Sequence, residues 1–216
     1  MPHRLLVLLL LGLSLVACAS SDTPARWKQL PPEQVGWAFG TITAEMSGPS
    51  GPMSRYTIRF RNLDTKEEGF FSINPGLDSS GEPDLYERRK TSGAFFDIPM
   101  PAGRYEFFEF WTVAASGFGS TEYRSREPFS VPFTIEQGKV HYLGEFRAYP
   151  LVGKNIFGMS LPAGGYFVLR DQEQRDTKLL LKRREVATVG PVKNVARELD
   201  TKRTPFLRPT PRGPGG

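Results

Sequence analysis

The sequence is poor in the residues that most often build metal sites and nucleophilic active sites. Its 216 residues include one cysteine, Cys18, and two histidines, His3 and His141. Behind position 18 the chain therefore has no disulfide, no thiol nucleophile and no cysteine-based zinc site. It also contains no Gly-x-Ser-x-Gly motif and no phosphate-cradling glycine loop. These absences argue against covalent catalysis, and we expect no cofactor and no metal.

The chain has a single long hydrophobic run, residues 5–16. A membrane-spanning helix needs about 20 apolar residues, so this run is too short for one. It follows the basic start Met-Pro-His-Arg and precedes small residues, which is the order of a secretory signal. We therefore predict that residues 1–17 are a leader that is removed on export.

The motif Leu15-Val16-Ala17-Cys18 directly follows the hydrophobic run and resembles the lipobox of bacterial lipoproteins. The resemblance implies cleavage between Ala17 and Cys18, a diacylglyceryl group on the Cys18 sulfur, and acylation of the new amino terminus by a chain such as palmitate. Several chains matter, because one chain, at about 0.8 kcal/mol per buried methylene, gives only marginal membrane binding. Ala19 and Ser20 follow, without the aspartate that retains many lipoproteins in the inner membrane. The resemblance thus implies an anchor in the periplasmic face of the outer membrane.

The remaining composition is typical of a β-rich domain. There are 22 glycines and 19 prolines together with 16 phenylalanines, 7 tyrosines and 3 tryptophans. Aromatic residues suit half-buried strands, and glycine and proline suit the turns between them. We expect a mainly β fold, an antiparallel β-sandwich with one short C-terminal helix. Residues 18–34 are predicted to be a lipidated tether, residues 35–186 the sandwich, and residues 187–216 an extended basic tail that is disordered at its end.

The formal net charge of +5 is modest, and removal of the leader with Arg4 leaves about +4. A surplus of this size permits attraction to anionic envelope surfaces. No nucleic-acid recognition motif accompanies it, so we expect no nucleic-acid partner.

Four segments before residue 120 show strand patterns. In Arg55-Tyr56-Thr57-Ile58-Arg59-Phe60-Arg61 apolar and basic residues alternate, which predicts a strand with a wet, basic outer face. Residues 36–44 and 68–73 are predicted to be its neighbours along the chain. In residues 104–115, strict alternation would place Glu109 between Phe107 and Trp111 on one face. A bulge at Phe107-Phe108 would instead turn Glu106, Glu109 and Trp111 outward, and we prefer the bulge.

The second half of the chain predicts a hairpin and a helix. Residues 129–136 and 140–146 both alternate, and a two-residue turn at Gln137-Gly138 would place Ile135 opposite Val140 in a hairpin. Residues 165–170 are expected to form the last strand. Asp171 is expected to cap a helix that ends at Arg184 and packs through residues 179–181.

Several of these phrases are similar to a loose group of bacterial lipoproteins with a small immunoglobulin-like or transthyretin-like sandwich. The similarity covers about residues 35–185 and depends on turn and strand motifs rather than on chemistry. The phrases are Met100-Pro101-Ala102-Gly103-Arg104-Tyr105, Phe133-Thr134-Ile135 with Gly138-Lys139-Val140-His141-Tyr142-Leu143-Gly144, and Arg175-Asp176 with the leucines that follow. It implies architecture, not activity, because a sandwich hosts many functions.

Candidate functional residues are few. Arg55, Arg59 and Arg61, with Trp111, form a candidate ligand surface for an anionic envelope polysaccharide or lipid. The oxygen-bearing residues between Asp78 and Asp84 loosely resemble a calcium loop, but a solvated acidic loop is the simpler interpretation.

Two other groups offer little catalytic potential. Alternation places His141 toward solvent or a loop, and Glu106 with Glu109 is a weak candidate for a glycosidase pair. We therefore expect a non-enzymatic, membrane-anchored envelope lipoprotein that contacts an envelope protein or supports envelope assembly. The alternative is a module that binds the anionic ligand.

Overall fold

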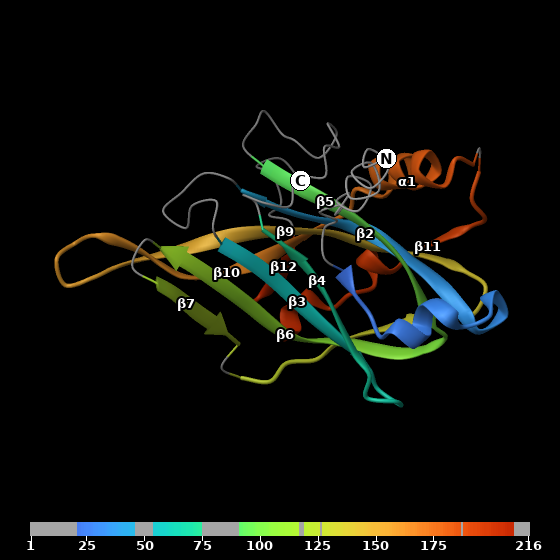
Figure 1. The fold of residues 1–216 in the computed structure, drawn as a ribbon, viewed down its shortest axis with the longest axis horizontal. Coiled ribbons are helices and arrows are strands. Elements are labelled where there is room, and N and C mark those ends of the chain that lie inside the picture. Colours follow the sequence, from blue (N-terminus) through green and yellow to red (C-terminus); the bar gives the residue numbers. More distant parts are fainter. Residues whose placement is uncertain are drawn as a thin grey trace, which may run out of the picture.

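The computed structural model describes residues 21–45, 54–74, 91–116, 119–125, 127–186 and 188–209. These residues form a mainly β structure in which two sheets pack face to face and one helix covers the outer face of the second sheet (Figure 1). The predicted β-sandwich with one short helix is confirmed.

The first sheet has six strands, all of them paired antiparallel. In spatial order they are β1 (Ser21–Asp22), β4 (Glu68–Ile73), β3 (Ser54–Asn62), β6 (Gly103–Ser116) and β7 (Gly119–Arg124), with β8 (Val131–Ile135) also paired to β6. Tyr56, Ile58 and Phe60 of β3 are buried, whereas its arginines face outward. The alternation predicted for β3 is therefore confirmed.

The second sheet also has six strands but is mixed. In spatial order they are β12 (Leu207–Pro209), β10 (Ser160–Arg170), β9 (Val140–Lys154), β2 (Val35–Glu45) and β5 (Thr91–Pro101), with β11 (Val192–Asn194) also paired to β9. β9 runs parallel to both β2 and β11, and β12 runs parallel to β10. These parallel pairs arise because the chain enters the sheet from the first sheet and from the helix rather than by tight hairpins.

The helix α1 (Glu173–Arg184) follows β10, as predicted, but its N-cap residue is Gln172 rather than Asp171, and the Gln172 side chain makes no capping hydrogen bond. The Asp171 carboxylate accepts a hydrogen bond from the Glu173 backbone N–H at 3.2 Å, and Leu179 and Leu180 are buried against the second sheet. The helix ends at Arg184, and the next residue, Glu185, has a left-handed backbone (φ 53°) and donates its N–H to carbonyls of the last turn. Four short 3-10 helices complete the described elements: η1 (Ala25–Gln29), η2 (Pro32–Gln34), η4 (Val195–Arg197) and η5 (Thr201–Arg203).

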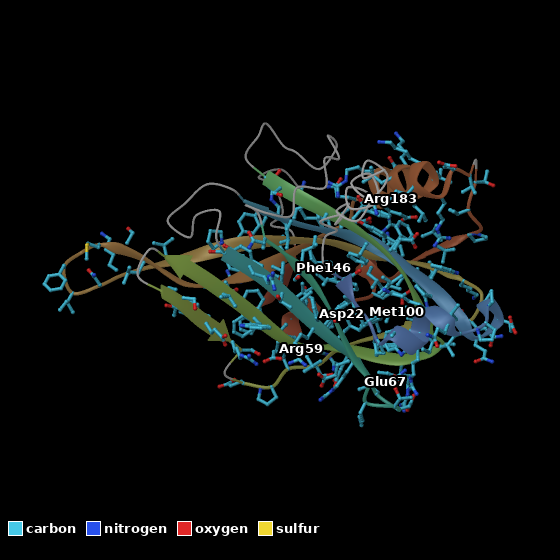
Figure 2. The ribbon with its side chains drawn as sticks, in the orientation of Figure 1. Asp22, Arg59, Glu67, Met100, Phe146 and Arg183 are labelled. Carbon is cyan, nitrogen blue, oxygen red and sulfur yellow. The ribbon has the colours of Figure 1, made fainter. Side chains whose placement is uncertain are left out.

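Phenylalanines dominate the core between the sheets. Phe71 of the first sheet stacks on Phe96 of the second with ring centroids 3.9 Å apart, and Phe107 meets Phe146 edge to face at 5.2 Å. In Figure 2, Phe146 lies between Arg59 on one side of the molecule and Arg183 of α1 on the other. The buried aromatic side chains thus pack into one large core between the two sheets.

The bulge predicted in β6 is confirmed. Arg59 pairs with Glu109 and Phe60 with Phe107, so Phe108 is the extra residue. The shift keeps Phe107 and Phe110 in the core and leaves Glu109 and Trp111 on the outer face. Without it, a carboxylate would enter the aromatic core.

The predicted hairpin between residues 129–136 and 140–146 is wrong in its pairing. Both strands and the turn at Gln137-Gly138 exist, but β8 pairs with β6 in the first sheet and β9 with β2 and β10 in the second. The turn is an arch that crosses between the sheets, and Gly138 supplies its positive φ of 68°. Alternation is the same in an arch and in a hairpin, because in both cases the two strands face one core.

The predicted tether at residues 18–34 is wrong for its described part. Ser21 and Asp22 pair with Phe71 and Phe70 of β4, and Trp27 of η1 is fully buried. The Trp27 indole N–H donates to the Glu67 carboxylate at 3.1 Å, next to the β3–β4 turn that Figure 2 labels at Glu67. One large aromatic side chain provides enough apolar area to fix this segment.

The predicted extended tail at residues 187–216 is also wrong as far as Pro209, and β10 is not the last strand. β11 and β12 add to the second sheet, and Val195, Leu199 and Leu207 are buried. These scattered apolar residues cover the outer face of β9 and the edge of β10. The described residues at both ends, from Ser21 and up to Pro209, therefore belong to the folded domain.

Candidate functional site

The predicted basic face on β3 is charge-balanced. Arg59 forms ion pairs with Glu68 and Glu109, and Arg61 Nε donates to Glu106 Oε1 at 2.6 Å. These are cross-strand pairs on the outer face of the first sheet. Among the described residues Arg55 has no ion-pair partner. The described part of the face is therefore a lattice of paired charges, to which Arg55 contributes no ion pair.

Aromatic side chains underlie the same lattice. The guanidinium groups of Arg61 and Arg59 lie 4.7 and 5.2 Å from the centre of the Phe108 ring, and Arg124 lies 4.6 Å from that of Trp111. The Trp111 indole N–H is buried without a hydrogen-bond partner in the described structure. The structure thus brings Trp111 onto the same face as Arg59, but it encloses the ring beneath a cation.

A cavity of about 450 Å³ opens beside this face, at the junction of the two sheets. Its floor is aromatic: the Phe206 ring stacks on Phe110 at 5.4 Å and on Phe129 at 6.2 Å. Arg124 and Arg203 supply two positive charges to its wall, and Glu127 supplies one negative charge. An apolar floor with cations on the wall suits an amphiphile with an anionic head.

Sequence reasoning missed this cavity because the residues that form it come from distant segments. Arg203 and Phe206 belong to the part of the chain predicted to be an extended tail, and Tyr123 and Phe129 flank the β7–β8 connection. Two glycines of β10, Gly164 and Gly165, line the cavity as well. The one signal of the cavity in the sequence is Phe206, an aromatic residue within a segment rich in Lys, Arg and Pro.

A second cluster missed by sequence reasoning is buried between α1 and the second sheet. The Asp176 carboxylate is fully buried and accepts hydrogen bonds from the Thr41 hydroxyl at 3.0 Å and the Tyr142 hydroxyl at 3.1 Å. Arg175 Nε donates to Asp176 at 2.8 Å. Burial raises the pKa of Asp176, which Arg175 opposes, and burial raises the pKa of Tyr142 as well. Every member is engaged, so the cluster fixes the helix on the sheet.

His141 is fully buried, and the prediction that it points to solvent is wrong. Its Nε2 accepts a hydrogen bond from the Glu136 backbone N–H at 3.0 Å, and burial lowers the pKa of the ring. The error has a physical cause, since α1 and residues 188–206 cover the outer face of β9, so that both faces of the strand are interior. His141 serves as a neutral structural acceptor.

Other candidate residues remain apart or lie outside the described chain. Glu106 and Glu109 are each held by an arginine on the lattice and do not line the cavity. Ala17, Cys18 and the loop between Asp78 and Asp84 lie outside the described residues. Within the described ranges, no group of three or more His, Cys, Asp or Glu side chains could hold a metal ion.

Comparisons with known proteins give no family. No family model matches the chain, and no curated protein matches it. Part of the chain is similar to a solved structure of a leucine-rich repeat protein from Bacteroides thetaiotaomicron VPI-5482, with 12% identity and a TM-score of 0.32. That similarity covers 54% of this chain and 14% of the other. In the part of the chain that the structure describes, no helix is long and apolar enough to cross a membrane.

Proposed function

We propose that the chain is the precursor of a lipid-anchored protein of the bacterial cell envelope, which acts without catalysis through contacts with an envelope protein or in envelope assembly. The observation that carries the proposal is the lipobox-like motif Leu15-Val16-Ala17-Cys18, and the position of β1 gives the anchor its structural consequence. Ser21 pairs with Phe71 of β4 only three residues after Cys18. Three residues span at most about 10 Å. A lipid on Cys18 would therefore hold the sandwich directly on a membrane surface.

The arrangement of the charged groups supports a contact function. Asp176 and His141 are enclosed by the fold, and Glu106 is held by Arg61. None of these three lines the cavity, whose wall offers arginine, glutamate, tyrosine and backbone instead. The proposal places the anchor in the periplasmic face of the outer membrane, because Ala19 and Ser20 follow Cys18.

In-cell crosslinking followed by membrane fractionation tests the proposal. The parent chain is expected in the membrane fraction with a stoichiometric protein partner, and Cys18→Ala is expected to lose both. Ser20→Ala, two residues away, leaves the lipobox intact and is expected to behave like the parent. Retention of the Cys18→Ala variant in the membrane with the same partner would contradict the anchor.

The cavity favours a second candidate function, binding of an anionic amphiphile or polysaccharide of the envelope. Its aromatic floor and two arginines supply apolar and charged contacts in one place. Retention on lipopolysaccharide or peptidoglycan, lost in Arg124→Ala plus Arg203→Ala, would support this function. Loss in Arg59→Ala plus Arg61→Ala alone would instead favour the outer lattice as the binding surface. Equal retention of both double variants and the parent would reject it.

A further inference from the structure

The hairpin formed by β9 and β10 extends beyond the rest of the sandwich, at the left of Figure 1 in orange. Of the seven large hydrophobic side chains that the described residues expose, six lie on this hairpin. They are Leu151, Val152, Ile156, Phe157, Met159 and Leu161. Ile156 and Phe157 at the tip are 93% and 78% exposed. Residues 149–163 contain no acidic residue and one basic residue, Lys154. Such a concentration of apolar side chains on a projecting element marks a contact surface.

The backbone of the tip makes its own hydrogen bonds. The Asn155 N–H donates to the Met159 carbonyl at 3.0 Å, and the Gly158 N–H donates to the Asn155 carbonyl at 2.9 Å. The Asn155 side-chain oxygen accepts from the backbone N–H groups of Phe157 and Met159, both at 3.0 Å. An unpaired backbone group is costly in an apolar medium. This tip can therefore leave water while keeping these bonds, as entry into a lipid layer requires.

The base of the hairpin carries aromatic rings and cations. Tyr149 and Tyr166 stack at 5.6 Å across the two strands. The guanidinium of Arg147 lies 5.6 Å from the Tyr149 ring centre, and that of Arg208 lies 3.8 Å from the Tyr166 ring centre. Tyrosines and cations gather where membrane-associated proteins meet the headgroups, and cations near that depth attract anionic lipids. From tip to base, the hairpin changes from apolar to aromatic and cationic in the order that a bilayer surface favours.

The amino-terminal strand points toward the same end of the sandwich. β1 runs antiparallel to β4, so that Ser21 lies nearer than Asp22 to the Ile73 end of β4. Ile73 pairs with Tyr56 of β3. Gly165, where the hairpin leaves the sandwich, lies so close to Tyr56 that a Cβ there would be 3.1 Å from the ring. The end of β4 that is nearer to Ser21 is therefore the end at which the hairpin leaves the sandwich.

The two lengths are compatible. Ile156 lies six residues after Pro150, a span of at most about 20 Å. The three residues from Cys18 to Ser21 reach at most about 10 Å. The hairpin is thus longer than the link to Cys18. If its tip enters about 5–10 Å below the headgroup–acyl boundary, most of this extra length lies within the lipid.

We propose that the tip of the β9–β10 hairpin inserts into the surface of a phospholipid bilayer and forms a membrane contact independent of the lipid on Cys18. The proposed function enters only in identifying this bilayer with the one that holds the anchor. Two contacts at one end of the sandwich would fix its orientation on the membrane.

The test uses residues 19–216, which contain every described residue and lack Cys18, with vesicles of phosphatidylethanolamine and phosphatidylglycerol. The domain is expected to co-sediment with the vesicles. Ile156→Ser plus Phe157→Ser is expected to lower the partition coefficient about tenfold or more, because two large apolar side chains are removed from the lipid. Val186→Ser, at the seventh exposed hydrophobic residue, is the control and should leave partitioning unchanged. Circular dichroism would check that all three proteins are folded.

Depth is measured separately with Phe157→Trp. Its added emission is expected to shift to the blue on vesicles and to be quenched by lipids brominated in the acyl chains. Absence of partitioning, or an indole at position 157 that stays unquenched, would overturn the proposal. Partitioning that salt abolishes and the double serine variant leaves unchanged would also overturn it and indicate electrostatic adsorption.

These outcomes are separate from those of the anchor. In cells, the double serine variant of the full chain is expected to stay in the membrane through Cys18. If the vesicles bind neither protein and the double serine variant loses a crosslinked protein partner, the hairpin is a protein-docking element and the lipid proposal is wrong.

Discussion

Replacement of Trp27 by alanine tests whether the segment before β2 belongs to the folded domain. Trp27 is fully buried, and its ring lies 6.2 Å from Phe60 and 5.9 Å from Tyr105. Loss of a buried tryptophan side chain costs about 3–5 kcal/mol of unfolding free energy. In a domain of this size each kcal/mol lowers the melting temperature by about 2–4 °C, so Trp27→Ala is expected to melt roughly 6–20 °C below the parent.

Thermal and urea unfolding of residues 19–216, followed by circular dichroism, would measure this change. Lys28→Ala is the matched control, because Lys28 is the exposed neighbour of Trp27 on the same 3-10 helix. It is expected to stay within about 0.5 kcal/mol of the parent. If Trp27→Ala has the same melting temperature and unfolding free energy as Lys28→Ala, residues 21–34 contribute no packing. The inferred short link between Cys18 and the sandwich is then wrong.

Two further predictions concern the polar residues. Arg61→Ala is expected to destabilise the domain by about 1–3 kcal/mol, since the largely buried Glu106 carboxylate loses its partner. Urea unfolding measures the change, and Arg55→Ala on the same face is the control. Equal effects of the two substitutions would refute the structural role of the Arg61–Glu106 pair. Burial lowers the pKa of His141 below its ordinary 6.5, so the unfolded chain binds a proton that the folded domain resists, and stability that is full above pH 6.5 falls as the pH is lowered toward 5. His141→Gln is expected to flatten this decline between pH 7.5 and 5, and an unchanged profile would refute the assignment.

Local patterns in the sequence predicted most strands, the bulge and the helix, because those features depend on neighbours in the chain. The alternation of β3 and the clash of Glu109 with an aromatic core both follow from a period of two. The strands with which β9 pairs do not follow from that period. The pattern of residues on either side of Gln137-Gly138 fits a hairpin and an arch equally well. Which of the two forms depends on whether β8 or β2 pairs with β9, and in the structure β2 does.

The two ends of the domain were mispredicted for a related reason. Proline and charged residues dominate residues 21–34 and 188–209, while the few apolar side chains that fix them, such as Trp27 and Leu207, are isolated in sequence. Their burial depends on surfaces made elsewhere, on β3 and β10. The cavity shares this origin, because Phe206 and Arg203 reach it only once β12 has paired with β10.

The ligand surface predicted at Arg59 and Arg61 illustrates what a strand pattern omits. Alternation placed both arginines outward, and the structure confirms their direction. It could not show that Glu68, Glu106 and Glu109 arrive on adjacent strands and balance their charge. The role of these arginines in binding a ligand stays a prediction, to be separated from their role in the fold by the variants above.

The most direct test of the account is the mass of the amino-terminal peptide of the mature protein, isolated from the membranes of a bacterium that expresses the full chain. A lipid anchor predicts a peptide that begins at Cys18 and carries a diacylglyceryl group on the sulfur together with an acyl group on the amine. A peptide that begins at any other residue, or at an unmodified Cys18, would contradict the lipid anchor and with it the position of the sandwich on the membrane.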